Sequence, residues 1–198
     1  MKTILFVDGQ NFKGKIKEVF ENGGQGRPEW RTYDFLGLMN LVLRDITLDE
    51  KIFYAAKIVR HPETDKKSLQ LIEEQRTLKT HLEKQGFSFV IAGRIRGQLT
   101  KDSKGKERLV FKEKGVDGRL AVDMVTMACD QRLKRAIIAS SDSDIQPAIY
   151  ELRKRNVETI YLGFETNVNK GLTYTTHRTM LIRDSEVLQF SKVGQLPL

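Results

Sequence analysis

The chain has 198 residues, of which 39% are hydrophobic and 30% are charged, so its composition excludes a disordered chain and fits one globular domain. A net charge of +8 favours an anionic partner, of which nucleic acid is the commonest. One cysteine excludes an internal disulfide, and three scattered histidines disfavour a Cys/His zinc site. The first apolar run stops at Asp8, too early for a signal peptide or a membrane span, so we expect a cytoplasmic protein with no membrane partner.

The first half of the chain alternates compact apolar runs with segments of helical periodicity. The first run, residues 3–7, suits a strand buried on both faces, and it stops at the turn signal Asp8-Gly9-Gln10-Asn11. Strands are predicted at residues 3–7, 51–59 and 87–92, and helices at residues 13–21, 33–44 and 64–85. Between them, residues 23–28 form a Gly-rich loop.

A basic segment interrupts this alternation. Residues 93–113 combine alternating charged and apolar side chains, a turn-rich stretch at residues 97–105 and a return strand at residues 109–111, which predicts a projecting β-hairpin. Between Arg94 and Arg119 the chain has nine Lys or Arg and four Asp or Glu, so this segment carries +5 of the net charge of +8. A charged hairpin is most often a solvated face, and its position directly before an acidic helix favours a binding role instead.

The second half continues the alternation. Helical periodicity covers residues 116–132, followed by an apolar strand at residues 136–139 that leads into two serines and two aspartates. A helix at residues 147–155 and strands at residues 157–162 and 180–182 follow. Strands alternating with helices predict a three-layer α/β/α sandwich with a central parallel sheet.

Carboxylates occur where the first and fourth strands end and on the helix between them: Asp8, Asp117, Asp123, Asp142 and Asp144. If those two strands are neighbours, Asp8 and Asp142 meet at the edge where open α/β sheets bind their ligands. Converging carboxylates repel one another, and a hard cation such as Mg²⁺ or Mn²⁺ relieves that repulsion. A carboxylate-held metal beside a basic surface is typical of phosphodiester hydrolysis. An Asp-x-Asp turn that merely caps a helix is the competing interpretation.

Two of these acids cannot point in the same direction. Asp117 and Asp123 are six residues apart, about 600° of rotation, so on a regular helix they lie roughly 120° apart. Asp123 is the preferred metal ligand, and Asp117 is expected at the N-cap, where it could still reach the rim of the site.

Three motifs resemble those of NYN domains, the PIN-like nucleases of the bacterial LabA-related group, in the order that the family has them. They are Phe6-Val7-Asp8-Gly9-Gln10-Asn11, then Glu113-Lys114-Gly115-Val116-Asp117 with Leu120-Ala121-x-Asp123-Met124, then Ser140-Ser141-Asp142-Ser143-Asp144. The resemblance covers residues 2–163 and implies a PIN-like, Rossmannoid sandwich with strand order 3-2-1-4-5. We therefore expect one domain over residues 1–198, with residues 164–198 as a C-terminal extension.

The resemblance also implies roles for individual residues. Asp8, Asp123 and Asp142 would be metal ligands, Asp117 a fourth acid, and Asp144 a ligand through water or a support. Asn11 would hydrogen-bond near the metal or the scissile phosphate. Two positions depart from the family pattern, since Ser141 stands where Gly is usual and Gly118 where an aliphatic residue is common. Neither change removes an acid.

Two functions remain open from the sequence. The first is a Mg²⁺- or Mn²⁺-dependent ribonuclease whose RNA is held by Ser141 and by five cations: Arg94, Arg96, Lys112, Lys114 and Arg119. The second is an RNA-binding or regulatory module of the same fold with little or no turnover. The physiological substrate and the oligomeric state, a homodimer included, stay undetermined. Trp30 is expected to pack, with base stacking as the alternative, and Cys129 is expected in the core.

Overall fold

The structure is a computed structural model that describes residues 1–60, 65–101 and 107–191, the side chains of residues 96–101 and 107–113 excepted. Its described residues contain a seven-stranded sheet in the order β4-β3-β2-β1-β5-β6-β7. The strands are β1 (Lys2–Asp8), β2 (Glu50–Lys57), β3 (Ser88–Lys101), β4 (Glu107–Lys114), β5 (Leu133–Ala139), β6 (Glu158–Phe164) and β7 (Arg178–Ile182). All neighbours pair in parallel except β3 and β4. The predicted α/β class and the order of five parallel strands are confirmed, and β7 adds a sixth at the edge.

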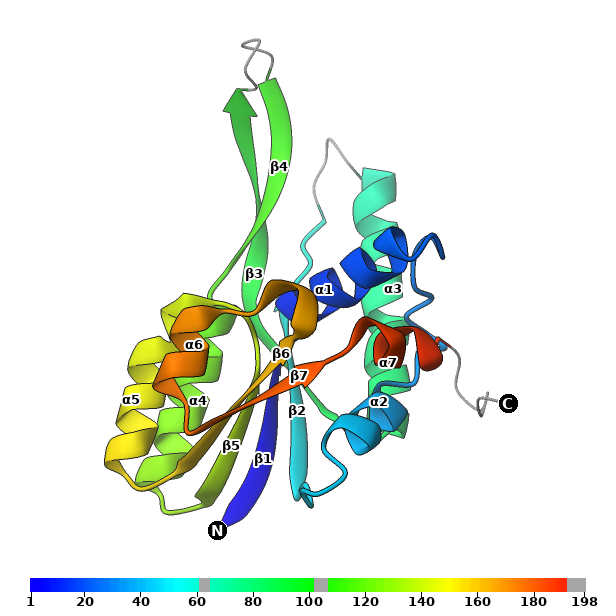
Figure 1. Cartoon of the computed structure of the whole chain (residues 1–198). Coiled ribbons are helices and arrows are strands. Elements are labelled where there is room, and N and C mark those ends of the chain that lie inside the picture. Colours follow the sequence, from blue (N-terminus) through cyan, green and yellow to red (C-terminus); the bar gives the residue numbers. More distant parts are fainter. Residues whose placement is uncertain (61–64, 102–106, 192–198) are drawn as a thin grey trace.

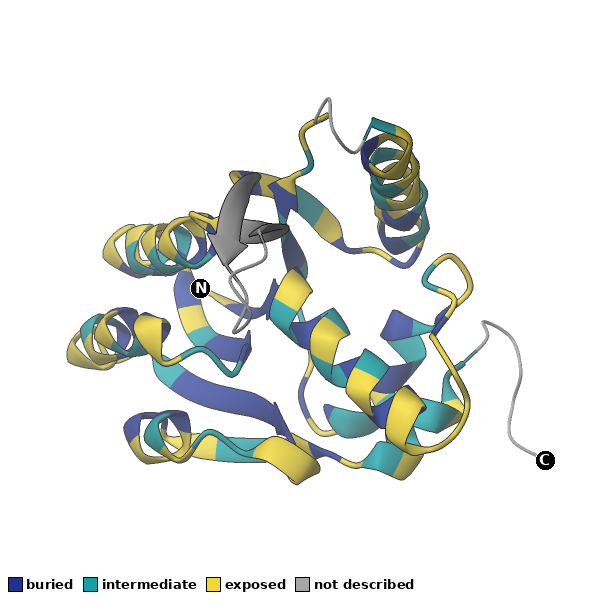
Figure 2. Ribbon diagram, turned by 90° about the horizontal axis from the view of Figure 1, so that it is seen from above, coloured by how far each residue is buried: buried dark blue, intermediate teal, exposed yellow. Residues whose placement is uncertain are grey.

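Helices cover both faces of this sheet (Figure 1). One layer contains α1 (Gly9–Asn22), α2 (Phe35–Val42), α3 (Asp65–Lys84) and α7 (Asp184–Gln189), and the other contains α4 (Val116–Cys129), α5 (Gln146–Lys154) and α6 (Lys170–Thr175). Successive residues of a strand point to opposite faces, so β1 supplies Leu5 and Val7 to the first layer and Ile4 and Phe6 to the second. All four are at most 1% exposed. Figure 2 shows the result, with buried strands between helices whose outer faces are exposed.

The first helix begins earlier than the turn signal predicts. The Asp8 side chain caps α1 by accepting a hydrogen bond from the Asn11 backbone N–H at 3.1 Å, so the expected turn is the first turn of the helix. Gly9 makes this tight junction possible, because a Cβ there would lie 2.5 Å from the Tyr54 carbonyl oxygen. The end of β1 is thereby tied directly to the start of α1.

The predicted hairpin is present as the extension of β3 and its antiparallel partner β4, in register from Arg94 opposite Lys114 to Lys101 opposite Glu107. Strand β3 continues through residues 97–101, where turn residues were expected, because the antiparallel pairing extends that far. Residues 102–106 lie outside the described part. The hairpin projects beyond the sheet at the end where the parallel strands terminate (Figure 1).

Residues after 163 add elements to both the sheet and a helix layer. Strand β7 pairs with β6, and Tyr33 donates a hydrogen bond to the Val187 carbonyl of α7 at 3.0 Å. The Asp34 backbone N–H donates to the Phe190 carbonyl. In the part of the chain that the structure describes, no helix is long and apolar enough to cross a membrane.

Candidate active site

The strand register brings Asp8 to the carboxyl ends of two adjacent strands. Val7 of β1 lies beside Ala139 of β5, so Asp8 and Ser140 leave the sheet together. Asp8 is 4% exposed, and its carboxylate accepts hydrogen bonds from the Asn11 backbone N–H and from the Ser140 hydroxyl, both at 3.1 Å. These two donors fix the orientation of the carboxylate at the sheet edge.

The loop after β5 holds Asp142 in place. The Asp142 backbone N–H donates to Ser140 Oγ at 3.1 Å, and its side chain caps a 3-10 turn (Ser143–Ile145) by accepting from the Asp144 backbone N–H at 2.9 Å. Asn11 Oδ1 accepts a hydrogen bond from the Ser141 backbone N–H at 3.0 Å. Asn11 thus connects the first turn of α1 to the loop of residues 140–144, which we call the acidic loop. Asp144 lies exposed at the rim of this loop.

Asp117 completes a group of three carboxylates. The N-cap of α4 is Gly115, with a φ of 94°, so Asp117 lies inside the first turn rather than at the expected N-cap position. Its carboxyl group interacts with the carboxyl groups of both Asp8 and Asp142. We call Asp8, Asp117 and Asp142 the acidic cluster.

The acidic cluster has a raised affinity for protons. Burial, followed by the charges of Asp8 and Asp142, raises the pKa of Asp117 to about 6. Burial likewise raises the pKa of Asp8, although the Asn11 and Ser140 hydrogen bonds oppose that change. Among the described residues, no Lys, Arg or His forms an ion pair with any of the three acids. Asp8 and Asp117 therefore hold a proton more tightly than isolated aspartates do.

Asp123 has different partners. Its carboxylate accepts from Arg119 Nε at 2.8 Å and from the Tyr54 hydroxyl at 3.1 Å. Tyr54 is fully buried, and burial with the neighbouring Asp123 charge raises the pKa of its phenol above the ordinary range. The rotation between Asp117 and Asp123 on a regular helix therefore separates them, and it is Asp117 that reaches Asp8.

The predicted RNA-binding residues are distributed around this edge. Arg94 and Lys114 are opposite one another at the base of the hairpin, and both are exposed. Arg96 and Lys112 are opposite one another two positions further along the hairpin, and their side chains lie outside the described part. Arg119 is exposed but paired with Asp123.

Ser141 is half-buried beneath two residues that the sequence did not single out. Its hydroxyl oxygen lies 3.5 Å from the Tyr161 hydroxyl oxygen, and its carbonyl accepts a hydrogen bond from Asn169 Nδ2 at 2.9 Å. Asn169 also caps α6 by accepting from the Leu172 backbone N–H at 3.0 Å. The C-terminal region therefore supports the acidic loop. An Asn before a short helical pattern is a cap signal that could have identified Asn169.

The donor chemistry of the acidic cluster suits a hard cation, although the acids are not arranged as a complete cage. Within residues 1–60, 65–101 and 107–191, no three His, Cys, Asp or Glu side chains are placed so that they could hold a metal ion. Two acids of the cluster, Asp8 and Asp117, instead have raised pKa values. Mg²⁺ and Mn²⁺ prefer carboxylate oxygens, and a metal competes with protons for such ligands. Asp8, Asp117 and Asp142 are thus ligands of the right chemical type for a divalent cation, without the placement of a formed site among the described residues.

Comparison with known proteins identifies the family. A family model for the NYN domain matches residues 2–181. The chain belongs to the NYN domain family. Membership indicates a nuclease-like protein of the PIN type, a class generally associated with nucleic acids and usually dependent on divalent metals. No curated protein matches the chain significantly.

A solved structure shares the fold of this NYN domain. The crystal structure of a protein of unknown function from Vibrio parahaemolyticus RIMD 2210633 superimposes with a TM-score of 0.58. The two sequences are 18% identical, and the match covers 91% of this chain and 93% of the other. At this identity the likeness establishes the fold alone.

Proposed function

We propose that this protein is a metal-dependent ribonuclease that hydrolyses phosphodiester bonds at the carboxyl ends of β1 and β5. The observation that carries the proposal is the acidic cluster, in which three carboxylates approach one another with no cationic partner among the described residues. Leaving charges in such an arrangement is unfavourable unless a cation joins them. Membership of the NYN family supports the same chemistry.

Each acid has a role in this proposal. Asp8, Asp117 and Asp142 would hold Mg²⁺ or Mn²⁺, and the ion would supply an activated water and neutralise charge at the phosphate. Asp144, exposed at the rim, acts through water. Asp123, which the sequence favoured as a direct ligand, supports α4 through Tyr54 and Arg119.

The remaining residues hold the loop and the substrate. The Ser140 hydroxyl donates a hydrogen bond to Asp8, and Asn11 accepts one from the Ser141 backbone N–H. Together, Asn11 and Ser140 hold Asp8 and the loop after β5 in fixed relative positions. The exposed Arg94 and Lys114 at the hairpin base bind the RNA backbone, together with Arg96, Lys112 and Arg119. Each neutralised phosphate releases counterions, so affinity for single-stranded RNA should fall steeply with salt, by a slope of about −0.7 per phosphate contact.

The experiment is cleavage of end-labelled single-stranded RNA with Mn²⁺ or Mg²⁺, with EDTA and the Asp142→Asn protein alongside. We expect product only with metal and intact Asp142. Product that persists in Asp142→Asn would contradict the proposed site. A matched control is Asp130→Asn, which removes an exposed carboxylate at the opposite end of α4.

A binding module without turnover is the second candidate, acting on RNA in the cytoplasm as the nuclease would. The absence of a ready-made metal cage among the described residues favours it. Its signature would be metal-induced thermal stabilisation and RNA binding with no product at any metal concentration. The nuclease proposal predicts stabilisation and cleavage together.

A further inference from the structure

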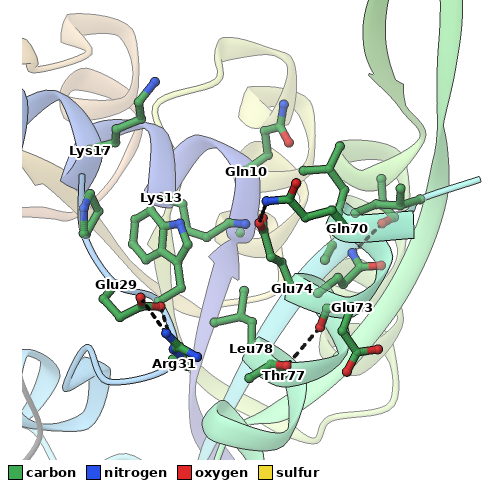
Figure 3. Close-up of a pocket in the computed structure, with 18 of the residues that line it drawn as sticks. Gln10, Lys13, Lys17, Glu29, Arg31, Gln70, Glu73, Glu74, Thr77 and Leu78 are labelled. Carbon is green, nitrogen blue, oxygen red and sulfur yellow. Dashed lines mark hydrogen bonds and ion pairs between the residues drawn. The ribbon is translucent and has the colours of Figure 1, made fainter. Parts of the chain in front are cut away.

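A pocket of about 800 Å³ lies beside the acidic cluster, between α1, the loop of residues 27–31 and α3 (Figure 3). Its walls include Trp30 from the loop, Lys13 from α1 and Glu74 from α3. A volume of this size is in the range that accommodates a small-molecule ligand or a nucleotide. We call it the Trp30 pocket.

We propose that the Trp30 pocket receives one unpaired base of a single-stranded RNA whose backbone crosses the acidic cluster. The inference rests on the proposed function, because it assigns a binding subsite to the same substrate. It predicts that the protein selects single strands, a property that the sequence leaves open.

The aromatic wall is the first argument. Trp30 is half-buried, and its ring is held from behind by Phe35, at 6.2 Å between centroids and 23° between planes, and by Tyr33 edge-on at 6.3 Å. The Lys13 ammonium lies over the Trp30 ring, 5.7 Å from its centroid, so a base that stacks on this face takes the place of the ammonium. An indole fixed by aromatic packing and facing a pocket is a stacking platform, and stacking is the usual way in which proteins bind unpaired bases.

The charges at the rim are the second argument. The pocket is lined by four cations, Lys13, Lys17, Arg27 and Arg31, and by three carboxylates, Glu29, Glu73 and Glu74. Arg27 and Arg31 have side chains that are 81% and 66% exposed, and their ion pairs with Glu21 and Glu29 are at the surface. Exposed pairs of this kind contribute little, so a phosphate can exchange for the acid. Lys17 likewise forms a surface pair with Glu21, at 3.5 Å, and its long stem can follow a phosphate in the same way.

Polar groups on α3 are the third argument. Figure 3 shows a hydrogen bond between Gln70 and Glu74, in which Gln70 Nε2 donates to Glu74 Oε1 at 2.7 Å. Gln75 Nε2 donates to the Ala56 carbonyl at the end of β2. Amide and carboxylate groups beside an aromatic ring provide donors and acceptors for the edge of a base.

The path from the acidic cluster to the Trp30 pocket is short. Gly9 and Gln10 line the pocket, and they follow Asp8 directly in the chain. A strand whose phosphate lies at Asp8 can therefore place a neighbouring base against Trp30. A base inside a duplex is paired and stacked and would have to leave its helix to do so.

The chain reports on this pocket directly, because Trp30 is its one tryptophan. We would titrate the intact protein in EDTA with a short single-stranded RNA and with a blunt duplex of the same sequence, following tryptophan emission and the anisotropy of a 5′-labelled strand. We expect the single strand to change the emission in parallel with the anisotropy, and the duplex to leave it unchanged. Binding of the single strand without an emission change, or an equal change with the duplex, would overturn the inference.

Variants separate stacking from folding. Trp30→Leu should weaken single-strand binding about tenfold by anisotropy, whereas Trp30→Phe, which keeps an aromatic ring, should stay within about threefold. Lys13→Ala with Lys17→Ala should weaken binding more than Lys134→Ala with Lys154→Ala, which removes the same charge elsewhere. Equal affinities across these pairs would overturn the inference.

The outcomes also separate this inference from the proposed function. Asp142→Asn should lose cleavage yet keep the Trp30 emission change. Cleavage with no Trp30 response would overturn the Trp30 pocket alone. An unmodified protein that binds no RNA would overturn both.

Discussion

Two carboxylates on the same helix have opposite environments. Asp117, in the first turn of α4, faces Asp8 and Asp142, and its pKa rises to about 6. Asp123 lies six residues later and is bound by Arg119 and by the buried Tyr54 hydroxyl. Burial and the neighbouring acids disfavour the charged form of Asp117, whereas Arg119 balances the charge of Asp123.

On the proposed function, this difference distinguishes an acid of the active site from an acid that supports the fold. A carboxylate with a cation and a buried donor stabilises the fold by itself, and nothing further is needed to explain its position. Carboxyl groups that raise one another's pKa values reduce the stability of the folded protein at neutral pH, and a bound cation would relieve that loss. The two carboxylates should therefore respond in opposite ways when each is replaced.

The largest expected effect is on cleavage. Asp117→Asn should lower the rate by about 100-fold or more, because it removes an anionic metal ligand. Asp123→Asn should stay within a few fold, since the amide oxygen can still accept from Tyr54. The measurement is the single-turnover rate on end-labelled RNA at saturating Mn²⁺. Similar losses in both variants would remove the distinction between the two acids.

Stability should show the reverse order. Asp123→Ala leaves the buried Tyr54 hydroxyl without its acceptor and should lower the free energy of unfolding by about 1–3 kcal/mol. Asp117→Asn should cause no such loss at pH 7.5. Urea denaturation of the three proteins, followed by circular dichroism, tests this. A destabilised Asp117→Asn protein with a wild-type Asp123→Ala protein would invert the assignment.

The pH dependence follows from the raised pKa of Asp117. In the folded protein the pKa of this acid is about 6 rather than the ordinary 3.8, so the folded state holds the proton more tightly than the unfolded state does. Its contribution to stability is thus complete below pH 3.8 and lost as the pH rises through about 6. The melting temperature of Asp117→Asn should exceed that of the wild type at pH 7.5 without metal, and the gap should close toward pH 4. A gap that is constant with pH would contradict the raised pKa.

A smaller effect is expected at the support of the acidic loop. Asn169→Ala removes the cap of α6 and the hydrogen bond to the Ser141 carbonyl, and should cost about 1 kcal/mol of stability. We expect cleavage to fall several-fold, because the loop that presents Asp142 loses a restraint. Asn169→Ser, which keeps a capping oxygen, should recover the stability but not the rate. Full recovery of both would show that Asn169 acts only as a cap.

The smallest effect is expected beside Asp117 itself. Gly118 is exposed in α4, and a Cβ there would meet no other atom within 4 Å. Gly118→Ala should raise the free energy of unfolding by about 0.5–1 kcal/mol, since Gly is a poor helix former. Its cleavage rate should match the wild type. A rate that falls sharply would indicate that the substrate passes close to this position.

The sequence predicted the layers, the parallel sheet and the meeting of Asp8 with the loop after β5, because buried strands and acidic strand ends are local patterns. Helical periodicity gives relative directions and does not say which direction faces the sheet edge, so it could not show that Asp117 approaches Asp8 while Asp123 accepts from Arg119 and Tyr54. The N-cap of α4 is Gly115 rather than the expected Asp117, a position that no local signal marked.

Other features that the sequence did not predict also depend on tertiary contacts. Cys129, expected in the core, is exposed in the last turn of α4, where its sulfur accepts from Arg155 Nε. The role of Asn169 depends on α6 packing against a loop 28 residues earlier. The Trp30 pocket joins α1, a loop and α3, and such a juxtaposition has no signature in sequence spacing.

The central claim is that a divalent cation replaces a proton in the acidic cluster. It is tested most directly by calorimetric titration with Mn²⁺ at pH 6 and pH 8, in buffers of different ionisation enthalpy, so that released protons are counted. We predict that binding releases protons at pH 6 and fewer at pH 8, that Asp117→Asn binds weakly without release, and that Asp123→Asn behaves as the wild type. Mn²⁺ binding with no proton release, undiminished in Asp117→Asn, would contradict the account.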